Sequence, residues 1–156
     1  MPNTERVELH ASEEIPASAA EVFALLTDWA GMMHWSLSAK GKGSLGAMIR
    51  CELIGERDRL PRTRRMILDS GATVEEELFY QDDQTRRIYY RKDDAFGTRG
   101  YIACSYVDGI DDNHCRLHIM SWFDFEGEAA AGAARFEGIY RGIFEGFRQY
   151  FTTARS

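Results

Sequence analysis

The strongest chemical signal in the sequence is a glutamate set among apolar and aromatic residues between Val74 and Tyr90. Side chains alternate between the two faces of a β-strand. One face of this segment would therefore carry Val74, Glu76, Leu78 and Tyr80. If the apolar members of that face point inward, Glu76 points inward too, and a buried carboxylate without a partner is strongly unfavourable. Glu76 is thus expected to meet a cation, a hydrogen-bonding ring or a wet cavity.

Two interpretations of Glu76 remain open. Residues 75–77 are all glutamate, so a register shift of one residue would exchange the faces and place Glu76 in solvent. The other interpretation places Glu76 in a cavity, where it or His118 would act as a base that removes a proton next to a carbonyl. Tyr90 or Arg50 would then stabilise the developing oxyanion. His118 also has a simpler explanation, because a lone histidine on a strand is commonly only hydrogen-bonded within the fold.

The hydrophobic pattern predicts a strand, two short helices, a series of strands and a long final helix. The first strand covers 6–15, and a helix follows from about 19 to 26. Residues 28–35 suggest a second short helix or turn, and the glycine-rich stretch 41–46 leads into the sheet. Further strands are expected at 47–54, 62–69, the two arms of the hairpin 74–90, 99–108 and 114–125. This order indicates an α+β fold with a curled antiparallel sheet of six to seven strands.

The final helix is expected from Ala129 to about Ala154 and should be amphipathic. Its apolar residues recur at helical spacing: Phe136, Ile139 or Tyr140, Ile143, Phe147, Tyr150 and Phe151. Gly138, Gly142 and Gly146 recur every fourth residue, so they share one stripe of the helix. This stripe has two explanations, close packing against the sheet or room for a ligand, because glycine permits close approach in either case.

Length, charge and composition limit the class of protein. The 156 residues suit one domain spanning 1–156, with 44% hydrophobic residues to build its core. The net charge of −6 argues against nucleic acid as a partner. The absence of a long apolar run predicts no membrane span, and the first residues lack a signal-peptide core. The sequence therefore predicts a cytoplasmic protein.

Several other chemistries lack support in the sequence. The four histidines show no ligand spacing beyond His114 and His118, so no metal site is expected. The glycines of 41–46 precede a strand rather than a helix, which excludes a phosphate loop or dinucleotide fingerprint, and no cofactor is expected. Arginines are concentrated in the segment 57–65. This segment is either a solvated loop or a region that steers an anionic ligand or an acidic partner.

The order of these elements resembles the SRPBCC superfamily, also called helix-grip or START-like. Its members include polyketide cyclases, plant pollen-allergen-type carriers and abscisic-acid receptors. The matching segments are IPASAAEVFALLTDWAGMMHW at 15–35, SLGAMIR at 44–50, EELFYQDDQTRRIYY at 76–90, the strand ending in Trp122, and YRGIFEGFRQYF at 140–151. The resemblance covers nearly the whole chain. It implies a helix-grip fold in which the sheet wraps around the long C-terminal helix, whereas one such fold hosts many activities.

The resemblance also implies a deep apolar cavity between the sheet and the last helix. Glu76 and Tyr90 match the glutamate and ring that line such cavities, and Tyr101 resembles a polar cavity residue beside an entrance loop at 96–100. Leu60 and Pro61 stand where related receptors carry a gate, although the arginines around them depart from the receptor pattern. The full set expected around a ligand is Trp35, Leu60, Pro61, Glu76, Leu78, Tyr90, Tyr101, Met120, Trp122, Phe136, Tyr140 and Ile143.

Two functions from different classes follow. The first is a carrier or sensor that binds a small hydrophobic or aromatic molecule, held by apolar walls and a few polar groups. The alternative is an enzyme of the polyketide cyclase or dehydrase kind, with Glu76, Tyr90, His118 and Arg50 as its catalytic groups. The sequence leaves the ligand and the formation of a homodimer open.

Overall fold

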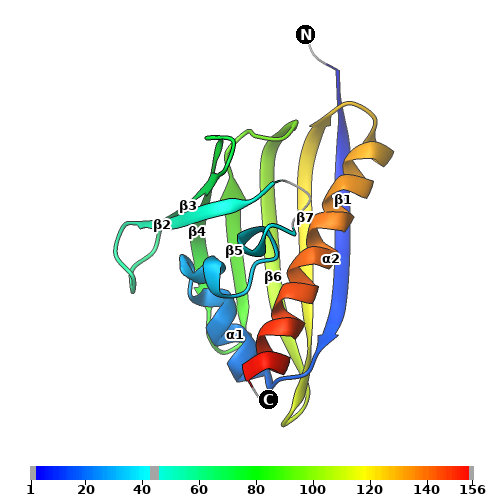
Figure 1. Cartoon of the computed structure of the whole chain (residues 1–156). Helices are drawn as coiled ribbons and strands as arrows, with labels where there is room; N and C mark the ends of the chain where they lie inside the picture. Colours follow the sequence, from blue (N-terminus) through cyan, green and yellow to red (C-terminus); the bar gives the residue numbers. More distant parts are fainter. Residues whose placement is uncertain (1–2, 43–45, 155–156) are drawn as a thin grey trace.

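The computed structural model describes residues 3–42 and 46–154, and its centre is one seven-stranded antiparallel sheet. The strands lie in the order β1-β7-β6-β5-β4-β3-β2 (Figure 1). Their bounds are β1 Thr4–Ile15, β2 Met48–Ile54, β3 Arg62–Leu68, β4 Thr73–Asp82, β5 Arg87–Lys92, β6 Thr98–Asp111 and β7 His114–Glu126. The helices are α1 Ala19–Thr27, the short 3₁₀ helices η1 Gly31–His34 and η2 Ser38–Lys40, and α2 Ala129–Ala154.

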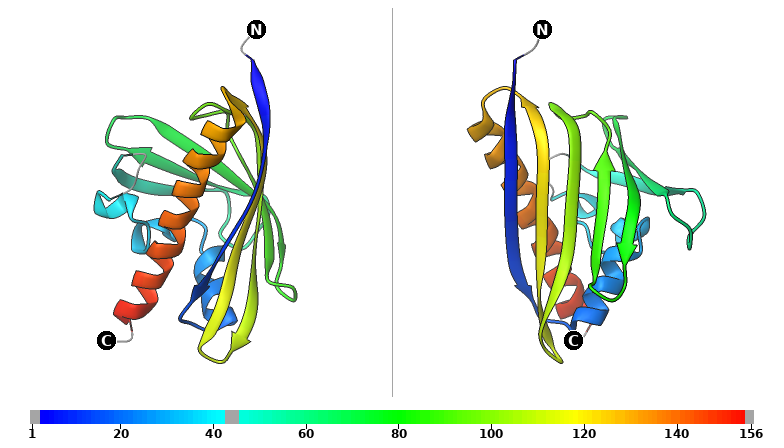
Figure 2. Two further views of the ribbon diagram at one scale, coloured as in Figure 1. Left: turned by 90° about the vertical axis from the view of Figure 1, so that its right-hand side faces the viewer. Right: turned by 180° about the vertical axis from the view of Figure 1, so that it is seen from behind.

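The sheet curves around α2. Figure 2 shows β2 and β3 bending away from the plane of β1 and β7, so that the sheet forms a concave face along which α2 runs. The helices α1 and η1 lie near one end of this concave face, next to the C-terminal part of α2. The α+β helix-grip architecture predicted from the sequence is confirmed, including the antiparallel sheet and the long final helix.

The first helix begins at a strong local signal. The Ser18 hydroxyl accepts a hydrogen bond from the Glu21 backbone N–H, and the Glu21 carboxylate accepts one from the Ser18 backbone N–H. This capping box satisfies two backbone groups that a helix N-terminus would otherwise leave unpaired. The segment predicted as a second short helix or turn forms η1, and η2 follows it. Part of the predicted glycine-rich stretch, residues 43–45, lies outside the described residues.

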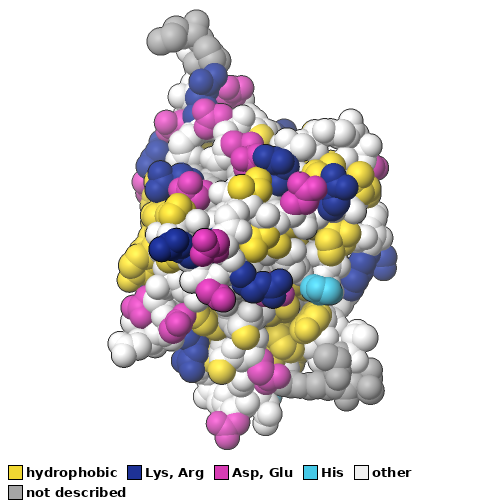
Figure 3. Space-filling model, turned by 90° about the vertical axis from the view of Figure 1, so that its left-hand side faces the viewer, with side chains coloured by type: hydrophobic (Ala, Val, Ile, Leu, Met, Phe, Trp, Pro, Cys, Tyr) yellow, Lys and Arg dark blue, Asp and Glu magenta, His cyan; other side chains and the backbone are white. Residues whose placement is uncertain are grey.

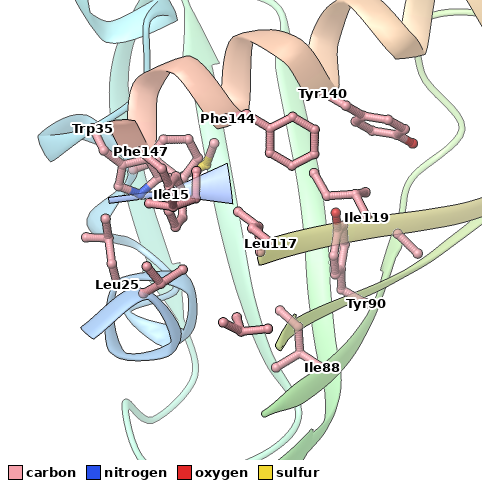
Figure 4. Close-up of a cluster of buried hydrophobic side chains, with 14 of the residues drawn as sticks. Ile15, Leu25, Trp35, Ile88, Tyr90, Leu117, Ile119, Tyr140, Phe144 and Phe147 are labelled. Atoms are coloured by element: carbon pink, nitrogen blue, oxygen red, sulfur yellow. The ribbon is translucent and has the colours of Figure 1, made fainter. Parts of the chain in front are cut away.

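Helix α2 covers the core with one face of aromatic side chains. Its bounds agree with the predicted helix. The buried residues of this face are Gly132, Phe136, Tyr140, Phe144, Gly146, Phe147 and Phe151. Figure 4 shows Tyr140 and Phe144 reaching from α2 toward the strands, with Phe147 against Trp35. The ring centroids of Trp35 and Phe147 lie 4.6 Å apart, edge to face, an arrangement that favours aromatic pairs. No helix among the described residues is long and apolar enough to cross a membrane.

The three glycines at every fourth position of α2 have different surroundings. A Cβ at Gly146 would lie 2.5 Å from the Trp35 carbonyl oxygen, so this glycine permits close helix packing. A Cβ at Gly142 would meet nothing within 4 Å, and one at Gly138 would meet only the Arg141 guanidinium, at 3.7 Å. Open space is found at Gly138 and Gly142, whereas Gly146 packs closely against Trp35, which follows η1, rather than against the sheet as expected.

The inward face of β4 is the predicted one up to a bulge. Val74, Glu76 and Leu78 are all buried, which excludes the shifted register that would have exposed Glu76. A bulge between Leu78 and Tyr80 then displaces the alternation, because an inserted residue turns the following side chains to the other face. Tyr80 is 44% exposed, so the expectation that it shares the inward face is wrong.

We expect Gly146→Ala and Gly142→Ala to change stability in opposite directions. The first adds a methyl group against a backbone carbonyl and should lower the free energy of unfolding by about 1–3 kcal/mol. The second enters open space and removes the poor helix propensity of glycine, which should raise it by about 0.5–1 kcal/mol. Urea unfolding followed by circular dichroism measures both. A loss of stability in Gly142→Ala equal to that in Gly146→Ala would contradict the assignment.

Candidate ligand-binding site

A cavity of about 270 Å³ lies between the concave face of the sheet and α2. Its apolar wall comes from the strands β2 to β6, the loop before β6, the segment around η1 and η2, and α2. These apolar lining residues are Met32, Trp35, Leu37, Met48, Met66, Leu68, Val74, Tyr90, Phe96, Tyr101, Phe136, Ile139, Tyr140 and Ile143. Gly138 and Gly142 also line it, so the open space beside α2 belongs to this cavity.

The charged part of the cavity wall is a row of three side chains on neighbouring strands. Glu76 on β4 is the direct register partner of Arg64 on β3 and of Lys92 on β5. Directly paired residues of antiparallel strands project from the same face of the sheet, with Cβ atoms about 5 Å apart. Arg64, Glu76 and Lys92 are each less than one-tenth exposed and line the cavity. We call these residues the charged row.

Arg64 is the cation that the burial of Glu76 requires. Arg64 Nε and Nη2 donate to Glu76 Oε1 at 2.8 and 2.7 Å. Trp29 completes the arrangement, because its ring lies 3.6 Å from the Arg64 guanidinium carbon and its Nε1 donates to the Glu76 carbonyl at 3.0 Å. Charge-assisted hydrogen bonds in a buried setting are stronger than neutral ones. The prediction that Glu76 meets a cation is confirmed.

Lys92 connects the charged row to the loop that precedes β6. Its ammonium donates to the carbonyls of Asp93 and Ala95 at 2.8 and 3.0 Å and to Thr98 Oγ1 at 2.6 Å. Burial lowers the pKa of Lys92, and the negative charge of Glu76 opposes that shift. The loop that Lys92 holds carries Phe96, which lines the cavity. Lys92 therefore shapes one wall of the cavity as well as placing a charge in it.

A short chain of hydroxyl groups joins α2 to the sheet. Tyr140 donates to Ser121 Oγ at 2.6 Å, and the hydroxyls of Tyr101 and Tyr140 lie 2.6 Å apart. Because the Tyr140 proton is already committed to Ser121, Tyr101 donates to the Tyr140 oxygen. Burial raises the pKa of Tyr140 to about 12 and raises those of Tyr90 and Tyr101 above their usual range. All three phenols therefore stay protonated at neutral pH.

Comparison with known proteins assigns the chain to a family. A family model described as polyketide cyclase / dehydrase and lipid transport matches residues 6–152. The chain belongs to this family. The resemblance to the SRPBCC superfamily inferred from the sequence is thereby confirmed. A search of curated proteins found no significant match.

Solved structures that resemble this family member extend over nearly its whole length. XoxI from Bacillus cereus shares 19% identity with a TM-score of 0.78, covering 96% of this chain and 99% of its own. A Thermobifida fusca protein shares 24% identity with a TM-score of 0.69, covering 92% of each chain. Norcoclaurine synthase from Thalictrum flavum, in complex with dopamine and hydroxybenzaldehyde, shares 15% identity with a TM-score of 0.68, covering 98% of this chain and 90% of its own. Similarity at these identities shows the fold alone.

Seven of the residues expected around a ligand line the cavity of this family member. They are Trp35, Glu76, Tyr90, Tyr101, Phe136, Tyr140 and Ile143. Leu78 is fully buried in the core and is not among the lining residues. Leu60 and Pro61 lie in the exposed loop between β2 and β3, and neither lines the cavity. Neither residue contacts the cavity in the described structure, which does not support their predicted role as a gate.

Four further predicted site residues lie away from the cavity. Met120, Trp122 and His118 are on the convex face of β7, because Leu117, Ile119, Ser121 and Phe123 are the residues that point inward. Arg50 lies on the edge strand β2 with its side chain 66% exposed, 2.8 Å from Glu52. The expectation that these four residues reach the cavity is wrong, since strand alternation and edge position direct them outward.

Among the polar residues of the cavity region that were not predicted from the sequence are Arg64, Lys92 and Ser121. Arg64 belongs both to the arginine-rich segment 57–65 and to the strand predicted at 62–69, which forms β3, and the arginines at 62 and 64 share the inward face of this strand. The alternation of Arg62, Arg64, Met66 and Leu68 was the signal that could have revealed this. Lys92 and Ser121 carried no comparable signal, because lysine and serine usually lie in solvent.

A second group of titratable side chains lies on the convex face, around His118. Its Nδ1 is 2.9 Å from His10 Nε2, and its Nε2 is 3.0 Å from Asp108 Oδ2. The Tyr106 ring stacks on His118 at a centroid distance of 4.2 Å. Burial lowers the pKa of His118, and the Asp108 carboxylate opposes this shift. Across residues 3–42 and 46–154, no three His, Cys, Asp or Glu side chains gather as a metal site would require.

We expect Arg64→Met to be far more destabilising than Arg65→Met. The first leaves the buried Glu76 carboxylate unpaired and should lower the free energy of unfolding by about 3–5 kcal/mol. The second removes the neighbouring pair between Arg65 and Glu75, whose side chains are both 40% exposed, and should lower it by less than about 1 kcal/mol. Urea unfolding compares the two variants. Equal losses would show that burial does not distinguish the pairs.

Acidification should destabilise the protein partly through His118. Its folded pKa lies below the unfolded value of about 6.5, so below that pH the unfolded chain binds a proton that the native state refuses. Stability from this group is present above pH 6.5 and is lost as pH falls toward the folded pKa. His118→Gln should therefore lose less stability than the wild type between pH 7.5 and 5. Urea unfolding of both proteins at pH 7.5 and at pH 5 tests this. An equal loss of stability in His118→Gln and the wild type would refute it. His10, Asp108 and Arg116 surround the ring and remain in both proteins.

Proposed function

We propose that this protein binds a small hydrophobic molecule in the cavity between the sheet and α2, as a carrier or a sensor. The observation that carries the proposal is open space beside Gly138 and Gly142 in an otherwise closely packed core. Protein interiors rarely keep voids larger than a water molecule. Membership in a family described as polyketide cyclase / dehydrase and lipid transport supports the proposal that the cavity holds a ligand.

The size and lining of the cavity support a small ligand with limited polar chemistry. A volume of about 270 Å³ lies just below the roughly 300–1,000 Å³ that is usual for small-molecule sites. Aromatic and aliphatic side chains form most of the wall, and the polar groups are confined to a few positions. Such a combination gives affinity through apolar burial and orientation through a few hydrogen bonds. A single aromatic acid or a short acyl chain fits this description better than a whole phospholipid.

The alternative function, a polyketide cyclase or dehydrase type of reaction, has weaker structural support. Of its four expected catalytic groups, Glu76 and Tyr90 line the cavity and His118 and Arg50 do not. Tyr90 stays protonated at neutral pH, so it can donate a hydrogen bond to an oxyanion but cannot act as a base. Glu76 is the one remaining carboxylate in the described cavity wall, and Arg64 binds its Oε1. Binding is therefore the function that we favour. A cytoplasmic location, the lack of a nucleic-acid partner and a homodimer stay predictions.

We expect a bulky side chain at position 142 to abolish binding without unfolding the protein. Gly142→Leu places the leucine side chain in the open space of the cavity. It should weaken the binding of the fluorescent probe N-phenyl-1-naphthylamine at least tenfold. The matched control is Arg141→Leu, which introduces the same apolar side chain at the preceding position of α2, where the residue is exposed and does not line the cavity. Fluorescence titration and thermal unfolding measure affinity and folding in parallel.

Native mass spectrometry of the purified wild type and both variants provides a second readout. A co-purifying small molecule should be present in the wild type and in Arg141→Leu and absent from Gly142→Leu. Failure of the wild-type protein to retain any molecule and to bind the probe would remove the proposal. Equal probe binding by all three proteins would place binding elsewhere on the chain.

A further inference from the structure

The charges that line the cavity are opposite in balance to those of the whole chain. The protein has a net charge of −6, and on the face shown in Figure 3 acidic and basic side chains lie side by side with hydrophobic ones between them. The described cavity wall instead contains three cations, Lys42, Arg64 and Lys92, and one carboxylate, Glu76. Two of these cations are buried members of the charged row, whereas Lys42 is exposed. An acidic protein thus presents an excess of positive charge to its ligand.

Glu76 cannot neutralise both neighbours in the charged row. Both bonds from Arg64 to Glu76 end on the same carboxylate oxygen. Lys92 directs its hydrogen bonds to the loop at 93–98 rather than to Glu76. Within the row, one carboxylate therefore faces two cations that are nearly excluded from solvent, and the other carboxylates near Lys92, those of Asp93 and Asp94, are exposed. Excess charge in an apolar setting is unfavourable, and its interaction with an incoming opposite charge is stronger than in water.

Arg64 also retains hydrogen-bonding capacity. A guanidinium has five N–H donors. Among the described residues, Arg64 uses Nε and Nη2 on Glu76 and Nη1 on the Trp29 carbonyl, at 3.4 Å. These bonds occupy one hydrogen on each nitrogen, so a second hydrogen on Nη1 and on Nη2 is left for another acceptor. A carboxylate is the acceptor that a guanidinium binds best.

We propose that the ligand of this cavity is a small amphipathic anion, a carboxylate with an apolar body, whose charged group lies at Arg64 and Lys92. The inference rests on the proposed binding function and names its ligand class. The apolar body lies against Met48, Leu68, Val74 and Ile143, which line the remaining wall. Lys42, being exposed, attracts the anion from solvent.

Three ligands with the same chain and different head groups test the charge preference. Octanoate, 1-octanol and octylammonium are each used to displace N-phenyl-1-naphthylamine from the wild-type protein at pH 7.5. We expect octanoate to bind about tenfold more tightly than 1-octanol, and octylammonium to bind most weakly. Equal or tighter binding of 1-octanol would overturn the anion assignment and leave the proposed function standing. If neither the probe nor any of the three binds, the proposed function itself fails.

Glu76→Gln gives a test with a definite sign. The substitution keeps the shape of the side chain, removes the one negative charge of the row and weakens the bonds that hold the Arg64 guanidinium. Octanoate should bind about three- to tenfold more tightly than to the wild type, and octylammonium should bind more weakly. The affinity for uncharged 1-octanol reports whether the cavity is intact and serves to normalise both values. Weaker normalised binding of octanoate would overturn the proposal, because it would make Glu76 a ligand anchor rather than an opposing charge.

Lys92→Met and Lys42→Met complete the series. Lys92→Met, at the buried position, should weaken the binding of octanoate about tenfold relative to that of 1-octanol. Lys42→Met, at the exposed position, should weaken it about twofold, and added salt should reduce only this smaller effect. Dividing each octanoate affinity by the 1-octanol affinity removes any effect of Lys92→Met on the loop that it holds. An unchanged ratio in Lys92→Met would overturn its assigned role.

Discussion

The buried ion pair between Arg64 and Glu76 is the constraint on which the rest of the site depends. Two ionised side chains leave water only if their mutual geometry and further hydrogen bonds replace the lost hydration. The strand register supplies the geometry, since Arg64 and Glu76 are direct partners on β3 and β4. Trp29 supplies the further contacts, one to the guanidinium face and one to the Glu76 backbone. Trp29, just before η1, is therefore held to the sheet by the same two residues that form the ion pair in the cavity wall.

The cavity exists because α2 contacts the elements around it unevenly. At its C-terminal half, Gly146 lets the helix backbone approach Trp35, and Phe147 packs on the Trp35 ring. Toward its middle, Tyr140 reaches the sheet through hydrogen bonds to Ser121 and Tyr101. These two attachments hold the helix at a fixed height above the concave face. Between and beside them Gly138 and Gly142 contribute no side chain, so space remains that the curvature of the sheet does not close.

Much of the fold and part of the site could be predicted from the sequence. Helix α2 and its cavity residues Phe136, Tyr140 and Ile143 follow from a strong helical period, which is a local property of the chain. The orientation of β7 could not be predicted in the same way, because apolar residues occupy both of its faces. Pairing with β1 decides it: Trp122 lies opposite Glu8, on the convex side. Arg64 was missed although its alternation with Met66 and Leu68 marks the inward face of β3, whereas Lys92 is recognisable as a buried cation only once its partner on the next strand is known.

Gly138 and Gly142 separate what holds the helix from what limits the ligand. The contacts that fix α2 belong to Tyr140, Gly146 and Phe147, whereas the volume beside the helix is set by two positions that contact almost nothing. A mutation that adds a methyl group at position 138 or 142 reduces the space available to a ligand, while the attachments of α2 stay in place. With the proposed function, the size of ligand that this chain accepts can therefore change through one or two codons, ahead of any change in the core or in the strand register.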